Sequence, residues 1–473
     1  MLILRRIKAS QLLYMSKAII VHLPLSNPTI SSILTVPHYM SVPLYISGNS
    51  LTMVKTALVI GGGHNGLMAA VTLRESGFNV TLIEARGKVG GMADTETMMG
   101  VKVSRAAYVL GLMPRRFVDK FNIPVIRQDP FQVTYINGKL IPFWRDRDKR
   151  VEALVKAGEV KFPEFEGKLL KFKELMESKF TFVNEPPSVG EIRDEAVKLG
   201  VEEFIEESCS RILSEYLSPD LHYTFMYPGM ENSPAYLIAY FYSPDWSFVK
   251  GGMGTVGDAM LRYALSIGIN VRLGVKVNGL EFKGDLVTGV ITNEGILKGD
   301  VVVSSVSPIL LDQWIKGKES SWRIPRPGWR KYNIVLKDYP RIPPELKPYA
   351  HSIMDTEAGE LVIPSILDET RGGVVLEFMG DLDSLLDMMP DIHEKALVID
   401  KLTPKDAEAT YNVPNGDVNH IPMRAPYVLN GRPGYRTQFL NLFQGSAGNY
   451  PGGQITGVPG YNAARLAVGV YSA

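Results

Sequence analysis

The sequence has a single cysteine, Cys209, among its 473 residues. A disulfide within the chain is therefore excluded, as are a zinc site built from several cysteines and a C-x-x-C redox centre. No run of residues approaches the ~18 apolar positions of a membrane-spanning helix. The net charge is only +1, so no basic surplus points to nucleic acid as a partner. No spacing of histidine, aspartate and glutamate suits a metal, and we expect none.

Acidic residues are absent from the first 74 positions, and Glu75 is the first. Residues 1–53 carry basic residues, serines and prolines instead. We interpret them as an extension outside the folded core, with Met53 as a translation start directly before the first strand. An organellar presequence is the less favoured alternative. We therefore expect a cytoplasmic protein, with peripheral membrane contact as a further expectation.

One stretch near the N-terminus alternates between strand-like and helix-like patterns. The apolar run 57–60 predicts a buried parallel strand. Residues 64–76 carry apolar side chains at helical intervals, and residues 79–83 predict a second strand. This order of elements is that of a Rossmann βαβ unit.

Three glycines follow the first strand in G-x-G-x-x-G spacing: Gly61, Gly63 and Gly66. The first permits a tight turn, the second lets a pyrophosphate approach the backbone, and the third lets the helix pack closely on the sheet. The helix N-terminus, with His64 and Asn65, would then direct free N–H groups at the phosphates. The alternative is a glycine-rich turn that only packs.

An acidic residue and a second glycine pair decide which dinucleotide is expected. Glu84 closes the second strand, where its carboxylate would accept both ribose hydroxyls and repel a 2′-phosphate. The motif E-A-R-x-x-x-G-G adds five expected contacts: Ala85, Arg86, Gly90, Gly91 and Met92. A nicotinamide site does not need this second pair, whereas an FAD site does. We predict FAD, bound non-covalently because Cys209 lies far from these motifs.

A second G-x-G-x-x-G, formed by Gly252, Gly254 and Gly257, does not predict another nucleotide fold. The run before it is not an apolar strand, and the strand from Asn270 ends without an acid; Arg272 lies there instead. With one nucleotide motif, an NAD(P)H reductase with two nucleotide domains is disfavoured. We expect a diffusible electron acceptor, a quinone or oxygen.

Alternating residues between 271 and 292 predict a β-meander with tight turns, and residues 301–305 predict another buried strand. A meander before a further parallel strand is typical of glutathione-reductase-like FAD domains. Val277 would offer its backbone to the adenine. The fold class predicted is α/β: an FAD-binding Rossmann domain, with a parallel sheet plus the β-meander, and an interleaved α+β substrate domain.

The two domains are expected to alternate along the chain. The FAD-binding domain takes 54–115, 246–310 and 406–473, and the substrate domain takes 116–245 and 311–405. Within the latter, a hairpin is predicted at 131–143 and amphipathic helices at 150–220. The aromatic-rich stretch 227–246 suits either core packing or an apolar substrate lining.

The C-terminal run completes the expected site. A strand-like run at 439–443 leads into the loop Q-G-S-A-G-N-Y-P-G-G at 444–453, and residues 456–468 predict a helix. The N-terminus of this helix would stabilise negative charge at the N1/O2 edge of the flavin. The expected contacts are Gly445, Ser446, Pro451, Gly452, Gly453 and Ile455.

Six segments carry a resemblance to a known family: GGGHNGLMAA (61–70), EARGKVGGMADTE (84–96), SRAAYVLGLMP (104–114), GGMGTVGDAM (251–260), GDVNH (416–420) and GSAGNYPGGQITGVPGYNAARLA (445–467). From Lys55 to Ala467 the chain resembles the phytoene desaturase-like FAD-dependent oxidoreductases, most of all their branch called pyridine nucleotide-disulfide oxidoreductase domain-containing protein. The resemblance implies non-covalent FAD and hydride transfer from a hydrophobic, isoprenoid- or carotenoid-like substrate to flavin N5. Two positions depart from the pattern: Ser446 stands where many such flavoproteins have aspartate, and Tyr450 where histidine is common.

No acid–base pair is legible in the sequence, so the catalytic residues stay unknown. The polar candidates are Arg105, Tyr450 and His420; a structural ion pair is an equal interpretation of Arg105, and a structural role one of His420. Two alternative functions remain open: a flavin amine oxidase, and a non-enzymatic lipid carrier or escort on the same fold. The oligomeric state is not predicted.

Overall fold

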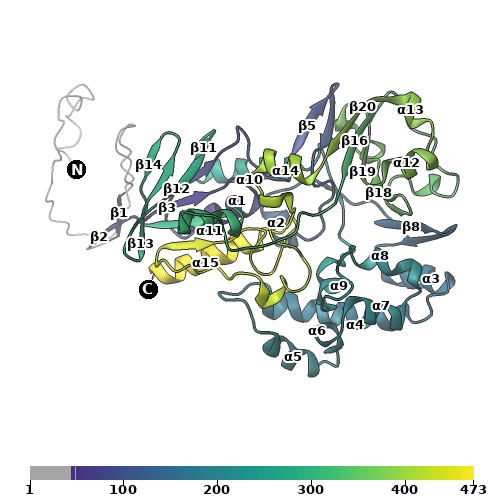
Figure 1. Ribbon diagram of the computed structural model, residues 1–473, viewed down its shortest axis with the longest axis horizontal. Coiled ribbons are helices and arrows are strands. Elements are labelled where there is room, and N and C mark those ends of the chain that lie inside the picture. The colour runs from purple at the N-terminus through teal and green to yellow at the C-terminus, as the bar shows by residue number, and fades with distance from the viewer. Residues whose placement is uncertain (1–43, 48–49, 473) are drawn as a thin grey trace, which may run out of the picture. The chain divides into compact units, whose positions relative to one another are not determined.

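The strand–helix–strand unit predicted around Gly61 lies at the centre of a parallel sheet in the computed structural model (Figure 1). Its elements are β3 (Thr56–Ile60), α1 (His64–Glu75) and β4 (Asn79–Glu84). The sheet order is β11-β4-β3-β15-β21, and every pairing is parallel. The outer strands are β11 (Asn270–Leu273), β15 (Val301–Ser304) and β21 (Leu442–Gln444).

Alternate residues of β3 enter two different hydrophobic cores, as the two-residue period of a strand requires. Ala57 and Val59 pack towards α1, α10 (Gly254–Ser266) and α15 (Val458–Ser472). Leu58 and Ile60 pack towards the predicted meander, which is present as β12 (Val277–Lys283), β13 (Leu286–Thr292) and β14 (Gly295–Leu297), and towards α11 (Pro308–Lys316). Both faces of the sheet are therefore covered, as is usual for parallel strands.

The second G-x-G-x-x-G builds no sheet of its own. The strand before it, β10 (Phe248–Val249), pairs antiparallel with β7 (Val125–Ile126), outside the parallel sheet. The motif is followed by α10 and then by β11, and β11 joins the same parallel sheet as β3 and β4. Arg272 forms an ion pair with Glu294, so its guanidinium has a partner within the chain.

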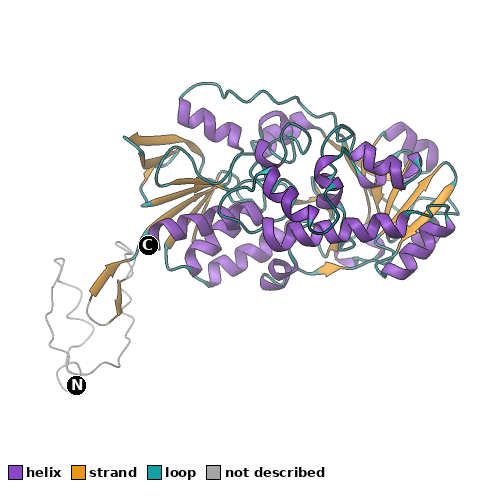
Figure 2. Ribbon diagram, turned by 90° about the horizontal axis from the view of Figure 1, so that it is seen from below, coloured by secondary structure: helices purple, strands orange, loops and turns teal. Residues whose placement is uncertain are grey.

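A second sheet has seven strands and takes them from two distant parts of the chain, in the order β20-β16-β19-β18-β17-β8-β9. The predicted hairpin supplies β8 (Gln132–Ile136) and β9 (Lys139–Phe143). The later strands are β16 (Lys331–Leu336), β17 (Ile353–Thr356), β18 (Gly359–Val362), β19 (Val374–Gly380) and β20 (Ala396–Leu402). The pair β17–β8 is parallel and joins the two parts; the others are antiparallel. In Figure 2 the strands of residues 55–472 gather into two groups with helices between them.

The amphipathic helices predicted at 150–220 are confirmed and continue to residue 241. They are α3 (Arg147–Lys156), α4 (Phe162–Leu175), the π-helix η3 (Met176–Phe180), α5 (Val189–Val197), α6 (Glu203–Glu206), α7 (Cys209–Tyr216), α8 (His222–Phe225) and α9 (Tyr236–Phe241). The remaining regular elements are α2 (Arg115–Lys120), the pair β5 (Thr95–Met98) and β6 (Val101–Ser104), α12 (Leu382–Met388), α13 (Ile392–Lys395) and α14 (Pro404–Tyr411).

The structure describes residues 44–47 and 50–472, and residues 1–54 form a unit separate from residues 55–473. In the first unit, β1 (Leu44–Ser47) pairs antiparallel with β2 (Ser50–Met53). Most of the predicted extension 1–53 lies outside the described residues. Within the described part of the chain, no helix combines the length and the apolar character needed to cross a membrane.

Candidate cofactor site

The first glycine turn has the backbone geometry that the motif predicts. Gly61 has a φ of +98°, which favours glycine, and its N–H donates to the carbonyl oxygen of Ile83 at 2.8 Å. A Cβ on Gly66 would overlap the carbonyl oxygen of Gly61, so α1 approaches the turn as closely as the chain allows. The hydroxyl of Ser305 donates to the carbonyl oxygens of both Ile60 and Gly61 at 3.0 Å and fixes the turn to the end of β15.

The motif around Glu84 folds back onto this turn. The carboxylate of Glu84 accepts hydrogen bonds from the N–H of Gly62 at 2.6 Å and of Arg86 at 2.8 Å. The N–H of Gly90 donates to the carbonyl oxygen of Gly62 at 2.8 Å, and Gly63 and Gly90 form an isolated parallel bridge. The first glycine turn and the Gly90–Gly91 pair are therefore neighbours, with no side chain between them.

Two of the expected contacts are held by the segment that follows. Arg86 donates to a carboxylate oxygen of Asp94 at 2.6 Å, and its guanidinium lies 4.8 Å from the ring centre of Tyr411. The carbonyl oxygen of Met92 accepts from the N–H of Ala107 at 3.2 Å. The segment 85–94 is thereby fixed between the glycine turn, α14 and the loop after β6.

The predicted adenine contact lies beside Glu84. The N–H of Val275 donates to the carbonyl oxygen of Glu84 at 3.0 Å, and the N–H of Gly274 donates to that of Arg86 at 3.0 Å. Val277 follows directly, at the first residue of β12, where it pairs with Thr292. The chain leading into the meander therefore runs alongside the end of β4.

The C-terminal loop meets the first glycine turn, although nearly 400 positions separate them in sequence. The imidazole of His64 lies close to the backbone of Gln454. The side-chain oxygen of Asn65 accepts from the N–H of Gly460 at 3.4 Å, and a Cβ on Gly460 would overlap the backbone of Asn65. A Cβ on Gly445 would likewise overlap the carbonyl oxygen of Pro459. The N-termini of α1 and α15 are thus adjacent.

Two histidines in this region are held neutral. Burial lowers the pKa of His64 to about 4. Burial, together with the neighbouring His64 and Arg432, lowers the pKa of His420 to about 3. Nε2 of His64 and Nδ1 of His420 are buried and have no hydrogen-bond partner in the protein. Buried polar atoms without partners are rare, so these two nitrogens suit contact with a bound molecule.

Arg432 lies next to these histidines, and no sequence motif points to it. It is only 2% exposed. Its guanidinium donates to five backbone carbonyls: Asn419 (3.0 Å), Ile421 (3.1 Å), Pro422 (3.1 Å), Tyr427 (3.1 Å) and Ala447 (2.7 Å). Its Nε has no partner, and no carboxylate of the described residues lies within 4 Å of it. Its partners are main-chain atoms, which no side-chain motif reveals.

The glycine loop itself is braced by tyrosines. Tyr236 donates to the carbonyl oxygen of Pro451 at 3.0 Å, and Tyr240 donates to that of Gly453 at 2.8 Å. The aromatic-rich stretch 227–246 therefore supports this loop and the core around it. Gly452 has a φ of +150° and lies against Met423, and Ile455 is buried.

Ser446 and Tyr450, the two residues that depart from the family pattern, both form hydrogen bonds within the chain. The N–H and hydroxyl of Ser446 donate to the side-chain oxygen of Asn449 at 2.8 and 3.0 Å. The hydroxyl of Tyr450 donates to the carbonyl oxygen of Phe180 at 2.8 Å, and burial raises its pKa. Tyr450 therefore links the loop to the π-helix η3.

Arg105, the third polar candidate, lies apart from Tyr450 and His420. Its guanidinium is 2.9 Å from the carboxylate of Asp400 on β20 and 3.6 Å from that of Glu96 on β5. This is the structural ion pair that the sequence left open as an alternative. Among the described residues, no group of three histidine, cysteine, aspartate or glutamate side chains is arranged to hold a metal ion.

The residues around the two glycine loops fit a dinucleotide. The glycines leave bare backbone where any Cβ would clash, and two helix N-termini lie beside it. Among the described residues, one nitrogen each of His64 and His420 and the Nε of Arg432 have no hydrogen-bond partner. A diphosphate needs the bare backbone and the helix dipoles, and a ring system with carbonyl and N–H groups needs neutral and cationic donors.

Comparisons with known proteins agree with this geometry. The family model of the NAD(P)-binding Rossmann-like domain matches residues 59–121. Pyridine nucleotide-disulfide oxidoreductase domain-containing protein 2 of Rattus norvegicus is 24% identical to this chain, over 87% of the chain and 92% of the relative. The 4,4'-diapolycopene oxygenase of Methylomonas sp is 24% identical, over 71% of the chain and 76% of the relative. The predicted resemblance is confirmed.

A solved structure extends the likeness to the fold. Cyclohexylamine oxidase from Brevibacterium oxydans has a TM-score of 0.57 to this chain, at 14% identity, and covers 89% of the chain and all of that structure. The predicted fold class is confirmed, and so is the prediction of an oxidoreductase of the FAD-dependent type.

Proposed function

We propose that this protein is a dehydrogenase of the desaturase type that binds FAD non-covalently and transfers a hydride from a hydrophobic, isoprenoid- or carotenoid-like substrate to flavin N5. One observation carries the proposal: the first glycine turn meets the C-terminal glycine loop and the helix α15 that follows it, since the side-chain oxygen of Asn65 accepts from the N–H of Gly460 and a Cβ on Gly460 would overlap the backbone of Asn65. A nicotinamide dinucleotide needs only the first of these loops, whereas FAD needs a second loop at the flavin end.

Each part of the chain has a task in holding the cofactor. The backbone of Gly61, Gly63 and Gly66 and the N-terminus of α1 bind the diphosphate, and Glu84 accepts hydrogen bonds from the ribose hydroxyls. The N-terminus of α15 faces the flavin end. When bound, FAD supplies a two-electron acceptor with a reactive N5.

The positive charge of Arg432 favours the binding of negatively charged groups at this site. The guanidinium is buried, lacks a carboxylate partner among the described residues, and is bonded to the carbonyl oxygen of Ala447 in the glycine loop. The nearby His64 and His420 stay neutral at neutral pH, because burial lowers the pKa of each. The chain therefore places one fixed cation, shielded from water, beside the loop that faces the flavin.

Support for a hydrophobic substrate comes from the relatives, among them a diapolycopene oxygenase. The acceptor that reoxidises the protein is proposed to be a quinone or oxygen, since only one nucleotide motif is present. Peripheral contact with a membrane would give access to such substrates.

The test starts with the purified protein. We expect flavin absorbance, and release of FAD into the supernatant after acid precipitation, which is the mark of a non-covalent cofactor. A colourless protein that takes up no added FAD would refute the proposal. Anaerobic bleaching of the flavin by isoprenoids, with polyamines as the matched panel, then tests the substrate class.

A second candidate, a flavin amine oxidase, is favoured by one observation. Asp355 and Glu360 face each other across β17 and β18, with Tyr108 donating to Glu360 at 2.5 Å and Thr224 donating to Asp355 at 3.1 Å. Burial raises the pKa of both carboxyls, that of Asp355 to about 7. A carboxylate pair beside tyrosine rings suits an ammonium group. Bleaching by polyamines with release of hydrogen peroxide would select this candidate.

A further inference from the structure

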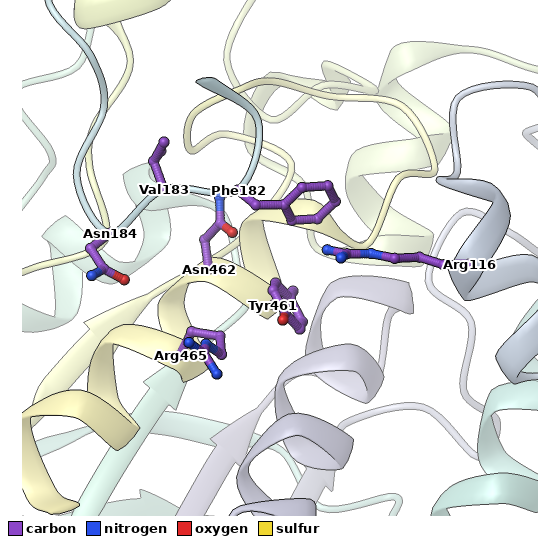
Figure 3. Close-up of a pocket in the computed structure, with 7 residues that line it drawn as sticks. All are labelled: Arg116, Phe182, Val183, Asn184, Tyr461, Asn462 and Arg465. Atoms are coloured by element: carbon purple, nitrogen blue, oxygen red, sulfur yellow. The ribbon is translucent and has the colours of Figure 1, made fainter. Parts of the chain in front are cut away.

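A pocket of about 240 Å³ lies between α2, the segment after η3, and α15 (Figure 3). Its walls are Arg116, Phe182, Val183, Asn184, Tyr461, Asn462 and Arg465. None of these residues takes part in the candidate cofactor site. Three stretches that are far apart in sequence build it, so it forms only in the folded chain.

One guanidinium in this pocket is held in place by aromatic rings. Arg116 lies 3.7 Å from the ring centre of Phe182 and 5.3 Å from that of Tyr461. The two rings contact each other edge to face, with centres 5.6 Å apart. Figure 3 shows Arg116 reaching across from α2 towards Phe182. Stacking on a ring orients the guanidinium and leaves its N–H edges free to bind a ligand.

A second guanidinium, that of Arg465, lies one helical turn after Tyr461 and lines the same pocket. Among the described residues, no carboxylate lies within 4 Å of Arg116 or Arg465. The nearest acids along the chain have other partners: Asp119 pairs with Arg115, and Glu185 with Arg436, each at 2.8 Å. Residues 1–74 contain no acid that could neutralise the pocket.

The pocket also offers a hydrogen-bond acceptor. Asn462 is 1% exposed, and its side-chain N–H groups donate to the carbonyl oxygen of Thr181 at 2.9 Å and to the hydroxyl of Tyr435 at 2.8 Å. Both donors are thereby occupied, and the side-chain oxygen remains for a donor on a ligand. Tyr435 in turn donates to the carbonyl oxygen of Tyr450, so the pocket adjoins the back of the glycine loop.

We propose that this pocket binds the phosphate group of an organic phosphate ester. Two guanidiniums without carboxylate partners present paired N–H groups that match phosphate oxygens, and a charge of −1.5 to −2 would neutralise both. A volume of about 240 Å³ holds a phosphate and a small part of the molecule attached to it. The ester is either a free small molecule or the headgroup of a phospholipid, and the recognising chemistry is the same.

The experiment measures binding to the FAD-loaded protein with two kinds of probe. Calorimetric titration with inorganic phosphate and pyrophosphate tests the free source. Co-sedimentation with phosphatidylcholine vesicles, with and without phosphatidic acid, tests the lipid source. The variants are Arg116→Gln and Arg465→Gln, and the matched control is Arg115→Gln, which removes the same charge from the neighbouring exposed position.

We expect saturable binding of at least one phosphate probe, weakened about tenfold or more by either pocket variant and less than about threefold by the control. Arg116→Lys keeps the charge but loses the stacked fork, and we expect an intermediate loss. Retained flavin absorbance shows that each variant is folded. If no probe binds saturably, or if Arg115→Gln weakens binding as much as Arg116→Gln, the proposal is overturned. Binding of the phosphatidic acid vesicles alone identifies a lipid headgroup.

Discussion

The parallel sheet and the seven-stranded sheet treat polar groups in opposite ways. The buried residues of the parallel strands are apolar except for Ser304, and backbone groups make the polar contacts around Gly61 and Gly90 at the carboxyl ends of the strands. The seven-stranded sheet buries charged side chains instead. Lys331, Arg371 and Glu377 are each no more than 1% exposed.

These buried charges pair with one another, although Nη2 of Arg371 and one carboxylate oxygen of Glu377 have no hydrogen-bond partner among the described residues. Arg371 is 2.8 Å from Glu377 and 3.1 Å from Asp368, and Glu377 also accepts from the N–H of Ser104 at 2.6 Å. Lys331 donates to the carbonyl oxygen of Ser104 at 2.6 Å, and burial lowers its pKa to about 8. Around the glycine turns, the partnerless atoms lie on His64, His420 and Arg432, which form no ion pair with the described residues. Ligand affinity should therefore depend on the first sheet and stability on the second.

The largest effect on ligand affinity is expected at the glycine turn. In Gly66→Val the new side chain would overlap the carbonyl oxygen of Gly61 and push α1 away from the diphosphate position. We expect FAD affinity to fall by about 100-fold or more, which is about 3 kcal/mol. Flavin content per protein and titration of the apoprotein measure this. Gly87→Ala is the control, because a Cβ there meets nothing within 4 Å; equal losses in both variants would contradict the prediction.

In the seven-stranded sheet, Arg371→Leu should act on stability instead. Removing one member of a buried ion-pair network leaves Asp368 and Glu377 uncompensated, at a cost of about 3–5 kcal/mol. Thermal and urea unfolding measure the loss, and exposed Arg341→Leu is the control. The FAD affinity of the folded fraction should change less than about threefold. A large loss of affinity with unchanged unfolding would break the comparison between the two sheets.

Acid should destabilise the protein through the two neutral histidines. Unfolded histidine binds a proton below about pH 6.5, whereas folded His64 and His420 do so only near pH 4 and 3. The unfolded state therefore binds more protons in this window, and stability falls as the pH is lowered from 6.5. We expect about 2 kcal/mol per histidine between pH 7 and 5. His420→Gln should reduce this dependence, unlike the exposed His393→Gln; an unchanged slope would count against buried neutral His420.

The smallest effect should come from the carboxyl pair on β17 and β18, with the opposite sign. The folded pKa of Asp355 is raised to about 7, so the folded state keeps a proton that the unfolded state loses above about pH 4. Stability should fall as the pH rises from 4 to 7. Because Asp355 is partly exposed, we expect Asp355→Asn to stabilise the protein by only about 1 kcal/mol at pH 8 and less at pH 5. Exposed Asp258→Asn serves as the control, and a destabilising Asp355→Asn would reverse the interpretation.

Local patterns predicted the glycine turns, the meander, the hairpin and the helices, but not every boundary. The strand expected at 439–443 begins only at Leu442, because the N–H of Leu440 donates to Asp285 and Phe439 stacks on Phe282, with ring centres 4.5 Å apart. The C-terminal helix begins at Val458, two residues later than expected. Contacts with the meander override the strand propensity of these residues.

The predicted candidates for polar chemistry illustrate a second limit. Arg105 proves to be paired with Asp400, almost 300 positions away, and Arg432 acts on carbonyl oxygens that any residue type could supply. Neither the ion pair of Arg105 nor the backbone hydrogen bonds of Arg432 correspond to a recognisable residue spacing in the sequence. The buried network around Arg371 was likewise not predicted: Asp368, Arg371 and Glu377 lie within ten residues of one another, but their backbone partners Lys102 and Ser104 come from β6, about 270 positions away.

By itself, the sequence determined the dinucleotide turn, since G-x-G-x-x-G between a strand and a helix, followed by Glu84, specifies that backbone within some 30 residues. Tertiary structure alone decided that Asn65 meets Gly460, that Arg432 stays buried without a carboxylate partner among the described residues, and that Arg116 and Arg465 share one pocket. The physical reason is range: a turn is fixed by the φ/ψ freedom of a few neighbouring residues, whereas these pairings depend on how packed cores bring distant segments together.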